Sequence, residues 1–419
     1  MKTFLSHSLA LLSLGLGIAH GAVVAVDPSQ NLQTVINNAN SGDDIILADG
    51  VYQSVLINNK SINISGISGT PQIAFLQVSN SPSVSQIKNI RITSDINSTT
   101  GLIQLNNCRV DGNINAFVSS IKLVNTTVVG NANFSGGEVG AKTIILRSSI
   151  GEKLSCDTEN LKIFYSQIRY ATMTGSSEIV GNVFDGRGIK EIGIDLAGAT
   201  TFSDIYNNRI HNYRFNSLDD DIEKFIGIRI KQNASANIVN NLIYDIQDTA
   251  QTGTESKIAM GIFVEKTQGT KILGNIFWGI YANNLPSSVI GNTMIYAPNE
   301  KVSIANNAFW RSSNYDTMNW VSGGAINTDP IIGDPKFTDF NNEDFTLAMN
   351  SPCIDAGPPA SQYNDHNGSR NDIGMFGGHN FIPDGRTTNK PIVLGLDVAP
   401  IAVPVGGTVT IESTGATVK

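Results

Sequence analysis

Three short segments of the chain share the pattern glycine, isoleucine, any residue, hydrophobic residue, and their variable positions include charged side chains. The segments are residues 193–196, 227–230 and 261–264. If their isoleucines point inward from β-strands, alternation places Asp195, Arg229 and Phe263 on the outer surface. The next outward row would hold Ala197, Lys231 and Glu265. This pattern predicts an outward cluster of mixed charge.

Further charged residues come just before the second of these segments. Arg209, His211 and the acidic run Asp219, Asp220 and Asp221 lie there. Such a set fits the chemistry of uronate sugars. A lyase must neutralise the sugar carboxylate, remove the adjacent C–H proton with a base, and protonate the leaving oxygen.

This chemistry assigns a role to each charged candidate. We expect Lys231 to act as the base, with Arg229 as the like-charge neighbour that also binds the carboxylate. Arg209 or His211 would lie nearby and take part in catalysis. Asp219, Asp220 and Asp221 would bind Ca²⁺, and Asp195 and Glu265 would contact substrate. The competing interpretation is an ordinary solvated surface of mixed charge.

A repeat explains how these residues are positioned. The template is aliphatic, any, Gly/Asn, Asn, any, apolar, and it recurs with an aliphatic first and apolar sixth position in every copy. The fourth position reads Cys108, Thr126, Ser148, Ser166, Asn182, Asn208, Asn241, Asn275, Asn292 and Asn307. Repeating coils made of short apolar runs, with turn residues between them, predict a parallel β-helix rather than a helical solenoid. Side chains at the fourth position would then stack and hydrogen-bond from coil to coil.

Three intervals in the repeat are longer than the others, and they place insertions before the three glycine-isoleucine segments. Loops carried on a rigid scaffold often hold binding and catalytic residues. We therefore place the candidate site beside these loops.

A second candidate surface is aromatic. Three residues after the repeated asparagine stand Tyr244, Trp278 and Trp310, in an outward row. These rings are candidates to stack on sugars. The alternative is that a C-terminal segment covers them, because neighbouring outward positions are apolar too.

The ends of the repeat look capped. Residues 31–40 have the apolar spacing of a short amphipathic helix, and "GDDIILADGVY" follows. With the asparagine-containing coils and the later "SPCIDAG", this resembles secreted right-handed parallel β-helix proteins of the pectate-lyase-like group. The resemblance implies an all-β, right-handed parallel β-helix. It leaves activity open, because that group includes lyases, hydrolases and non-catalytic surface proteins.

Two branches of that group have motifs near Lys231. Residues 227–231 resemble the G-x-x-x-R-H-G strand of alginate and chondroitin-B lyases, although Gln232 and Asn233 stand where that branch has His-Gly. Arg229-Ile230-Lys231 matches the R-I-K of polygalacturonases, whose paired Asp and His-Gly are not found here in the required order. A calcium-assisted lyase is therefore the first hypothesis. The alternatives are a non-catalytic carbohydrate-binding or adhesion protein and a polygalacturonase-type glycoside hydrolase.

The predicted domains follow chain order. Residues 1–21 read as a signal peptide, 22–328 as the β-helix with its cap, and 329–378 as a C-terminal module. Residues 379–390 read as a linker, and 391–419 as the start of an immunoglobulin-like sandwich. In the module, Asp365, Asn367, Asn371 and Asp372 offer oxygens either to calcium or to ordinary turns.

The amino-acid composition limits the kinds of molecule that the protein is expected to bind. The 419 residues carry a net charge of −8, which disfavours nucleic acid. The three cysteines, an odd number, are expected to be buried free thiols. After the signal peptide no stretch is long and apolar enough for a membrane span. We expect a secreted or cell-surface monomer that acts on polysaccharide.

Overall fold

The computed structural model describes residues 21–67, 69–117, 120–136, 142–187, 192–198, 201–215, 224–248, 258–267, 269–282, 292–297, 301–310, 319–379, 392–399 and 410–416. Almost all of the predicted signal peptide lies outside these residues. None of the helices in the described ranges has the length and apolar character needed to cross a membrane.

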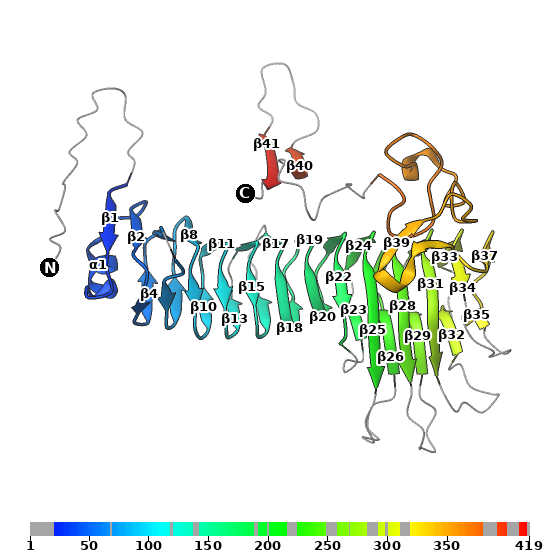
Figure 1. Cartoon of the computed structure of the whole chain (residues 1–419), viewed down its shortest axis with the longest axis horizontal. Helices are drawn as coiled ribbons and strands as arrows, with labels where there is room; N and C mark the ends of the chain where they lie inside the picture. The colour runs from blue at the N-terminus through cyan, green and yellow to red at the C-terminus, as the bar shows by residue number, and fades with distance from the viewer. Residues whose placement is uncertain are drawn as a thin grey trace.

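Short parallel strands stack along one long axis (Figure 1). The described strands form a 14-stranded sheet and a 23-stranded sheet, and the second sheet supplies two faces of the solenoid. Crossover connections between parallel strands of one sheet are almost always right-handed. The predicted right-handed parallel β-helix is confirmed.

The first face is the 14-stranded sheet. Its strands are β1 (Val23–Val26), β2 (Asp44–Leu47), β5 (Asn63–Gly66), β8 (Val84–Lys88), β11 (Leu102–Asn106), β14 (Ser120–Val124), β17 (Thr143–Leu146), β19 (Leu161–Phe164), β21 (Ser177–Val180), β24 (Phe202–Tyr206), β27 (Ser235–Val239), β30 (Thr270–Leu273), β33 (Val302–Ala305) and β36 (Asn327–Thr328).

The second face follows the first in each coil. It comprises β3 (Val51–Tyr52), β6 (Gln72–Ile73), β9 (Arg91–Ile92), β12 (Arg109–Val110), β15 (Thr127–Val128), the starts of β18 (Ser149–Cys156) and β20 (Gln167–Met173), β22 (Val183–Asp185), β25 (Arg209–Phe215), β28 (Leu242–Asp248), β31 (Ile276–Ala282), β34 (Ala308–Trp310) and β37 (Ile331–Ile332).

The third face completes the coil. It comprises β4 (Val55–Asn58), β7 (Leu76–Ser79), β10 (Ile96–Thr99), β13 (Ile114–Phe117), β16 (Ala132–Ser135), the ends of β18 and β20, β23 (Ile192–Leu196), β26 (Lys224–Ile230), β29 (Ile258–Val264), β32 (Asn292–Tyr296) and β35 (Asn319–Ser322).

Inward aliphatic side chains of all three faces make one continuous core. Ile205, Ile238 and Ile272 follow one another in register on the first face and are fully buried. Burying a side chain of this size contributes roughly 1.5–3 kcal/mol, so stacked coils are stable although each coil alone is not.

The predicted asparagine ladder lies in the turn between the first and second faces. Asn208 receives the Asn182 amide N–H at 2.9 Å, and Asn241 receives that of Asn208 at 2.9 Å. Ser148 and Ser166 continue the same chain of bonds upstream. The side chains are fully buried, so each polar group needs the partner that the next coil supplies.

One predicted member of the ladder is wrong. Asn292 begins β32 on the third face and pairs in register with Ala259. The ladder runs directly from Asn275 to Asn307, 32 residues apart, with an amide-to-carbonyl distance of 2.9 Å. The apparent copy of the template at 289–294 therefore contains a strand of the third face and no ladder turn. Four successive coils, rather than three, are long.

The N-terminal cap is confirmed as helix α1 (Leu32–Asn38). Asn31 caps it, because its side-chain oxygen accepts the Thr34 N–H at 2.9 Å. Leu32 and Ile36 are buried in the core, where they cover the inward side of the first coils.

The C-terminal module packs on the outer side of the second face (Figure 1). It contains β38 (Phe337–Asp339) and β39 (Asp344–Leu347), which pair antiparallel, and the 3-10 turns η1 (Phe340–Asn342) and η2 (Ser361–Tyr363). Phe345, Cys353 and Ile373 contact Leu242, Ile276 and Ala308 in one buried cluster.

The predicted immunoglobulin-like segment is described only as two antiparallel strands. These are β40 (Ile392–Ala399) and β41 (Thr410–Ala416). Their identity as part of a sandwich stays a prediction. All three cysteines are free and buried, as expected, and burial raises the pKa of Cys108 to about 11.

Candidate functional site

The three glycine-isoleucine segments lie side by side on the third face, in β23, β26 and β29. Ile194, Ile228 and Ile262 pair in register and are fully buried. A Cβ on Gly193 or Gly227 would lie 2.7 Å from the carbonyl oxygen of the next glycine in the stack. Only glycine fits there, because the backbones of neighbouring coils leave no room for a Cβ at the motif.

The outward residues between them form a charge cluster. Arg229 binds Asp195 with two hydrogen bonds, Nε to Oδ1 at 2.8 Å and Nη2 to Oδ2 at 2.7 Å. Lys231 Nζ lies 3.0 Å from the same Oδ2. Two cations therefore share one carboxylate, and the cluster retains a formal charge of +1.

Burial disfavours the charged form of Asp195, but the hydrogen bonds from Arg229 and Lys231 outweigh burial and lower its pKa. The Asp195 side chain is only 9% exposed, whereas that of Lys231 is 36% exposed. The negative charge therefore sits inside the cluster, while the cations reach the surface.

The surroundings of Lys231, the predicted base, differ from those expected from the sequence. The sequence placed a like charge, Arg229, beside it. The structure adds the Asp195 carboxylate, which offsets that repulsion and holds Lys231 in an ion pair. Glu265, expected in the same outward row, is exposed and its Oε2 accepts the Gln232 N–H at 3.3 Å.

Two stacked aromatic rings continue the outward row next to Arg229. Phe263 follows Arg229 in register and Tyr296 follows Phe263, and both rings are partly exposed. Their centroids lie 5.1 Å apart with planes 16° from parallel. Tyr296 is not among the predicted site residues, because the repeat template predicts a ladder turn at 289–294, where the structure has the start of β32.

The structure places Arg209 and His211 on a different face from Lys231. Both belong to β25 on the second face, whereas Lys231 directly follows β26 on the third. Arg209 forms an ion pair with Glu343 of the C-terminal module, Nη1 to Oε2 at 2.8 Å, and its guanidinium lies 5.5 Å from the Phe345 ring centroid. The expected grouping of Arg209 or His211 with Lys231 is therefore not found.

His211 is stacked on Tyr244, with ring centroids 4.8 Å apart and planes 2° from parallel. Burial, and then the charge of Arg209, lower the pKa of His211 to about 4, so the imidazole is neutral at neutral pH.

The predicted aromatic row exists, but the C-terminal module covers part of it. Tyr244 is 5% exposed and lies 5.2 Å from the Phe345 ring. Trp278 stacks on Tyr244 and on Trp310, and the Phe340 ring packs on it in a T-shaped arrangement with centroids 4.1 Å apart. Tyr244 is therefore inaccessible to a sugar. At this residue the C-terminal segment covers the aromatic row, as the alternative interpretation predicted. Trp310 is partly exposed.

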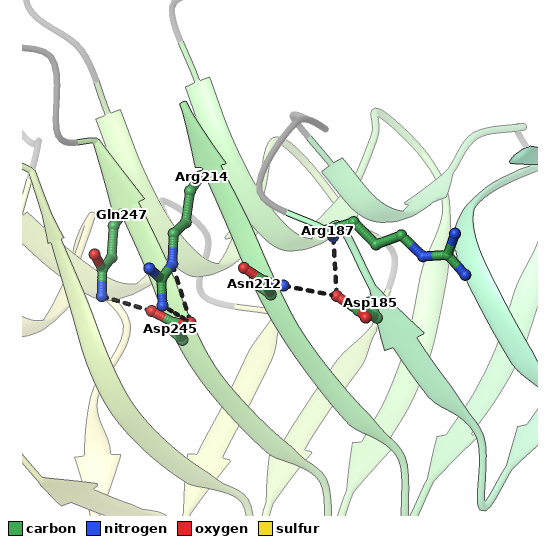
Figure 2. Close-up of polar contacts among 6 residues, drawn as sticks. All are labelled: Asp185, Arg187, Asn212, Arg214, Asp245 and Gln247. Carbon is green, nitrogen blue, oxygen red and sulfur yellow. Dashed lines mark hydrogen bonds and ion pairs between the residues drawn. The ribbon is translucent and has the colours of Figure 1, made fainter. Parts of the chain in front are cut away.

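Next to this row, β25 and β28 each contain a residue in the left-handed conformation, Asn212 and Asp245, whose φ angles are 65° and 57°. Figure 2 shows their contacts: Asn212 Nδ2 donates to Asp185 at 2.9 Å, and Asp245 accepts from Arg214 and from Gln247. The carboxylates of Asp185 and Asp245 are therefore engaged in local hydrogen bonds.

The predicted calcium ligands Asp219, Asp220 and Asp221 lie outside the described residues. Within the described ranges no group of three or more His, Cys, Asp or Glu side chains could hold a metal ion. In the C-terminal module, Asp365 and Asp372 accept backbone N–H groups, and Asn371 pairs with Asn240. Hydrogen bonds within the module, and to Asn240 of the β-helix, thus engage the side chains of Asp365, Asp372 and Asn371.

No protein-family model matches the chain, and no curated protein matches it. Solved structures similar to it include the pectate lyase Pel9A, with 14% identity, 86% of this chain and 97% of that chain covered, and a TM-score of 0.42.

Two further similar structures are named as PL6 family lyases. A variant of the alginate lyase AlyGC has 13% identity and a TM-score of 0.37, with 79% of this chain and 56% of that chain covered. The polysaccharide lyase from Pseudopedobacter saltans has 13% identity and a TM-score of 0.31, with 74% and 91% covered.

Proposed function

We propose that this protein acts on an acidic polysaccharide, which it binds across the third face at β23, β26, β29 and β32. The observation that carries the proposal is the Asp195–Arg229–Lys231 cluster, whose net charge is +1 and whose cations reach the surface. A sugar carboxylate complements this charge, and guanidinium groups bind carboxylates well.

The stacked rings beside the cluster extend the same argument. Phe263 and Tyr296 follow Arg229 in the row and offer an apolar platform for the C–H face of a sugar ring. A cation next to an aromatic platform suits a ring that carries both a carboxylate and apolar C–H groups. The ligand would therefore run along the solenoid axis.

The finer proposal is cleavage by β-elimination. Arg229 neutralises the uronate carboxylate, and Lys231 removes the proton from C5. The C4–O bond then breaks, a C4=C5 double bond forms, and the departing oxygen takes up a proton. Lys231 must release its own proton before it can act as the base. The predicted calcium enters no step here.

The second candidate is a non-catalytic glycan-binding or adhesion protein, and the Lys231–Asp195 ion pair favours it. In that case both cations serve only to bind carboxylates. The two candidates share a ligand and a surface, but they differ in whether any bond is broken.

Ultraviolet absorbance of unsaturated uronates separates the candidates. Wild-type protein is incubated with pectate, alginate and sulfated glycans, with calcium or with a chelator. If Lys231 is the base, Lys231→Ala lowers the rate by about 100-fold or more. The matched control, Lys271→Ala, changes an exposed lysine on the first face and should retain full activity.

Each result has a distinct meaning. Absorbance that rises in wild type and is lost in Lys231→Ala supports the lyase. Binding without absorbance, weakened by Lys231→Ala, supports the adhesion candidate. Reducing ends released without absorbance indicate hydrolysis, and absence of both binding and products contradicts the proposal.

A further inference from the structure

The second face has an open stretch that the C-terminal module leaves uncovered. The module covers Leu242, Ile276 and Ala308 in the first outward row of that face. Upstream, the same row continues in register as Thr127, Ser149, Gln167 and Val183, and it meets the module at Arg209, which contacts Glu343 and Phe345. Five successive coils at about 4.8 Å spacing span roughly 19 Å.

Two adjoining cavities lie over this stretch. One, of about 90 Å³, is lined by polar residues that include Arg169, Asp185, Arg187 and Arg209. The other, of about 320 Å³, is lined by residues that include Arg147 and Tyr165. They share Ser149, Gln167 and Val183, so together they form one groove. We call it the arginine groove.

Positive charge is concentrated at this groove. It is lined by four of the chain's 11 arginines, from four successive coils, although the whole protein carries a net charge of −8. The smaller cavity has three arginines and one aspartate, a formal charge of +2. General basicity of the protein therefore does not explain the groove.

Two of these guanidinium groups have hydrogen-bonding capacity left over. The Nε atoms of Arg169 and Arg209 are buried, and no acceptor contacts either of them in the described structure. Arg169 itself is only 9% exposed. Buried donors of this kind normally have a partner, so an acceptor that enters the cavity would be favoured.

The counter-charges of the groove are internal or lie at its rim. Arg169 pairs with Glu152 at 2.6 Å and Arg209 with Glu343 at 2.8 Å, and these glutamate side chains are 41% and 60% exposed. Each of these printed bonds uses one Nη nitrogen and leaves the Nε without an acceptor, and the exposed glutamate end of each pair is screened by water. Asp185 Oδ1 accepts the Arg187 backbone N–H and Asn212 Nδ2, both at 2.9 Å.

Arg187 is the most accessible of the cations. Figure 2 shows its side chain extending away from the Arg214–Asp245 pair, while only its backbone contacts Asp185. The residue is exposed and its φ angle is 52°, so its backbone is held in the left-handed region by the Asp185 bond.

We infer that the arginine groove is a second binding site, for the oxyanion groups of an acidic saccharide. It lies on the second face and is distinct from the Asp195–Arg229–Lys231 cluster on the third. Arg187 and Arg209 would bind a carboxylate or sulfate ester, and Ser149 and Gln167 would contact sugar hydroxyls. The saccharide part of this inference depends on the proposed function, whereas the oxyanion part does not.

The test uses the full chain with Arg229→Gln and Lys231→Gln, which removes the third-face cluster. Calorimetry measures binding of an oligogalacturonate and of a sulfated oligosaccharide of equal length, which separates the two oxyanion sources. We expect binding to persist, and Arg187→Gln in this background to weaken it about tenfold or more. Added NaCl should weaken it as well.

Two further variants make the result specific. Ser149→Phe fills the floor of the groove but retains every arginine, and it should weaken binding at least as much as Arg187→Gln does. Arg91→Gln is the matched control, because Arg91 lies in the same outward row, upstream of the groove, and pairs with Asp111 at 2.6 Å. It should leave the affinity unchanged.

Loss of all binding in the double variant, when wild type binds, would overturn the second site. If wild type binds no saccharide, the proposed function and the saccharide assignment fail together. Inorganic sulfate then decides the remaining part: a rise in Tm in wild type that Arg187→Gln removes supports the oxyanion site, and equal Tm shifts refute it.

Discussion

At the scale of single residues, the environment decides whether an ionisable side chain carries charge. Asp195 is buried and ionised because Arg229 and Lys231 donate to it. His211 is buried beside Arg209 with no carboxylate bonded to it in the described structure, so it is neutral. Its Nε2 is buried and has no hydrogen-bond partner there. Residue type alone did not distinguish these cases.

The neutral imidazole predicts how stability depends on pH. The pKa of His211 is 6.5 in its ordinary state and about 4 in the folded protein. As pH falls from about 6.5 to about 4, the unfolded chain gains a proton that folded His211 does not bind, so stability is lost across that window. His211→Phe keeps the ring stack on Tyr244 and should flatten this part of the Tm curve.

Thermal unfolding of both proteins between pH 8 and pH 4 measures the effect. The Tm of His211→Phe relative to wild type should rise as pH falls below 6.5. His379→Gln, at an exposed position, is the control and should follow the wild-type curve. Parallel curves for His211→Phe and wild type would contradict the neutral, buried imidazole.

At the scale of elements, the ladder and the outward rows are both stacks of hydrogen-bonded side chains, but burial makes them energetically different. Asn241 donates to Ile205 O and to Asn275 Oδ1, each at 2.9 Å, and accepts the Asn208 N–H, all without access to water. On the third face, Asn115 donates to Asn97 at 3.0 Å and accepts from Asn133 at 2.9 Å, but it is partly exposed.

The same substitution should therefore have different costs at the two positions. Asn241→Ala leaves several buried groups without partners and should lower the free energy of unfolding by about 3 kcal/mol or more. Asn115→Ala exposes its partners to water and should cost less than about 1 kcal/mol. Urea unfolding followed by circular dichroism measures both; similar midpoint shifts would refute the distinction.

At the scale of the whole molecule, the C-terminal module decides which outward surfaces stay open. Phe345 is 4% exposed and contacts the rings of Tyr244 and Phe337. Asn371, more than 100 residues away in sequence, exchanges hydrogen bonds with Asn240 next to the ladder. The module thereby closes the downstream part of the second face and leaves the arginine groove upstream.

Removing the central contact should release the module and leave the solenoid intact. Phe345→Ala should increase acrylamide quenching of tryptophan fluorescence, because Trp278 loses its cover, and should accelerate proteolysis within 336–378. The β-sheet circular dichroism should not change. Phe117→Ala, at a 56% exposed position on β13, is the control, and equal proteolysis of both variants would contradict this role of Phe345.

The solenoid, its ladder and its helical cap were predictable from the amino-acid sequence. These features depend on local periodicity, and each coil repeats the environment of the one before, so a short template predicts the neighbours of every repeated residue. The template failed at Asn292, where similar residues occur in a strand of the third face.

The grouping of the candidate residues, in contrast, depends on contacts between segments that are far apart in the sequence. Asp195 pairs with Arg229 and Lys231 because strand register brings two segments together, while Arg209 and His211 belong to another face of the solenoid. Tyr244 is covered because a segment 100 residues further along the chain packs on it. Long insertions and distant segments follow no period, so their contacts depend on packing that no local pattern specifies.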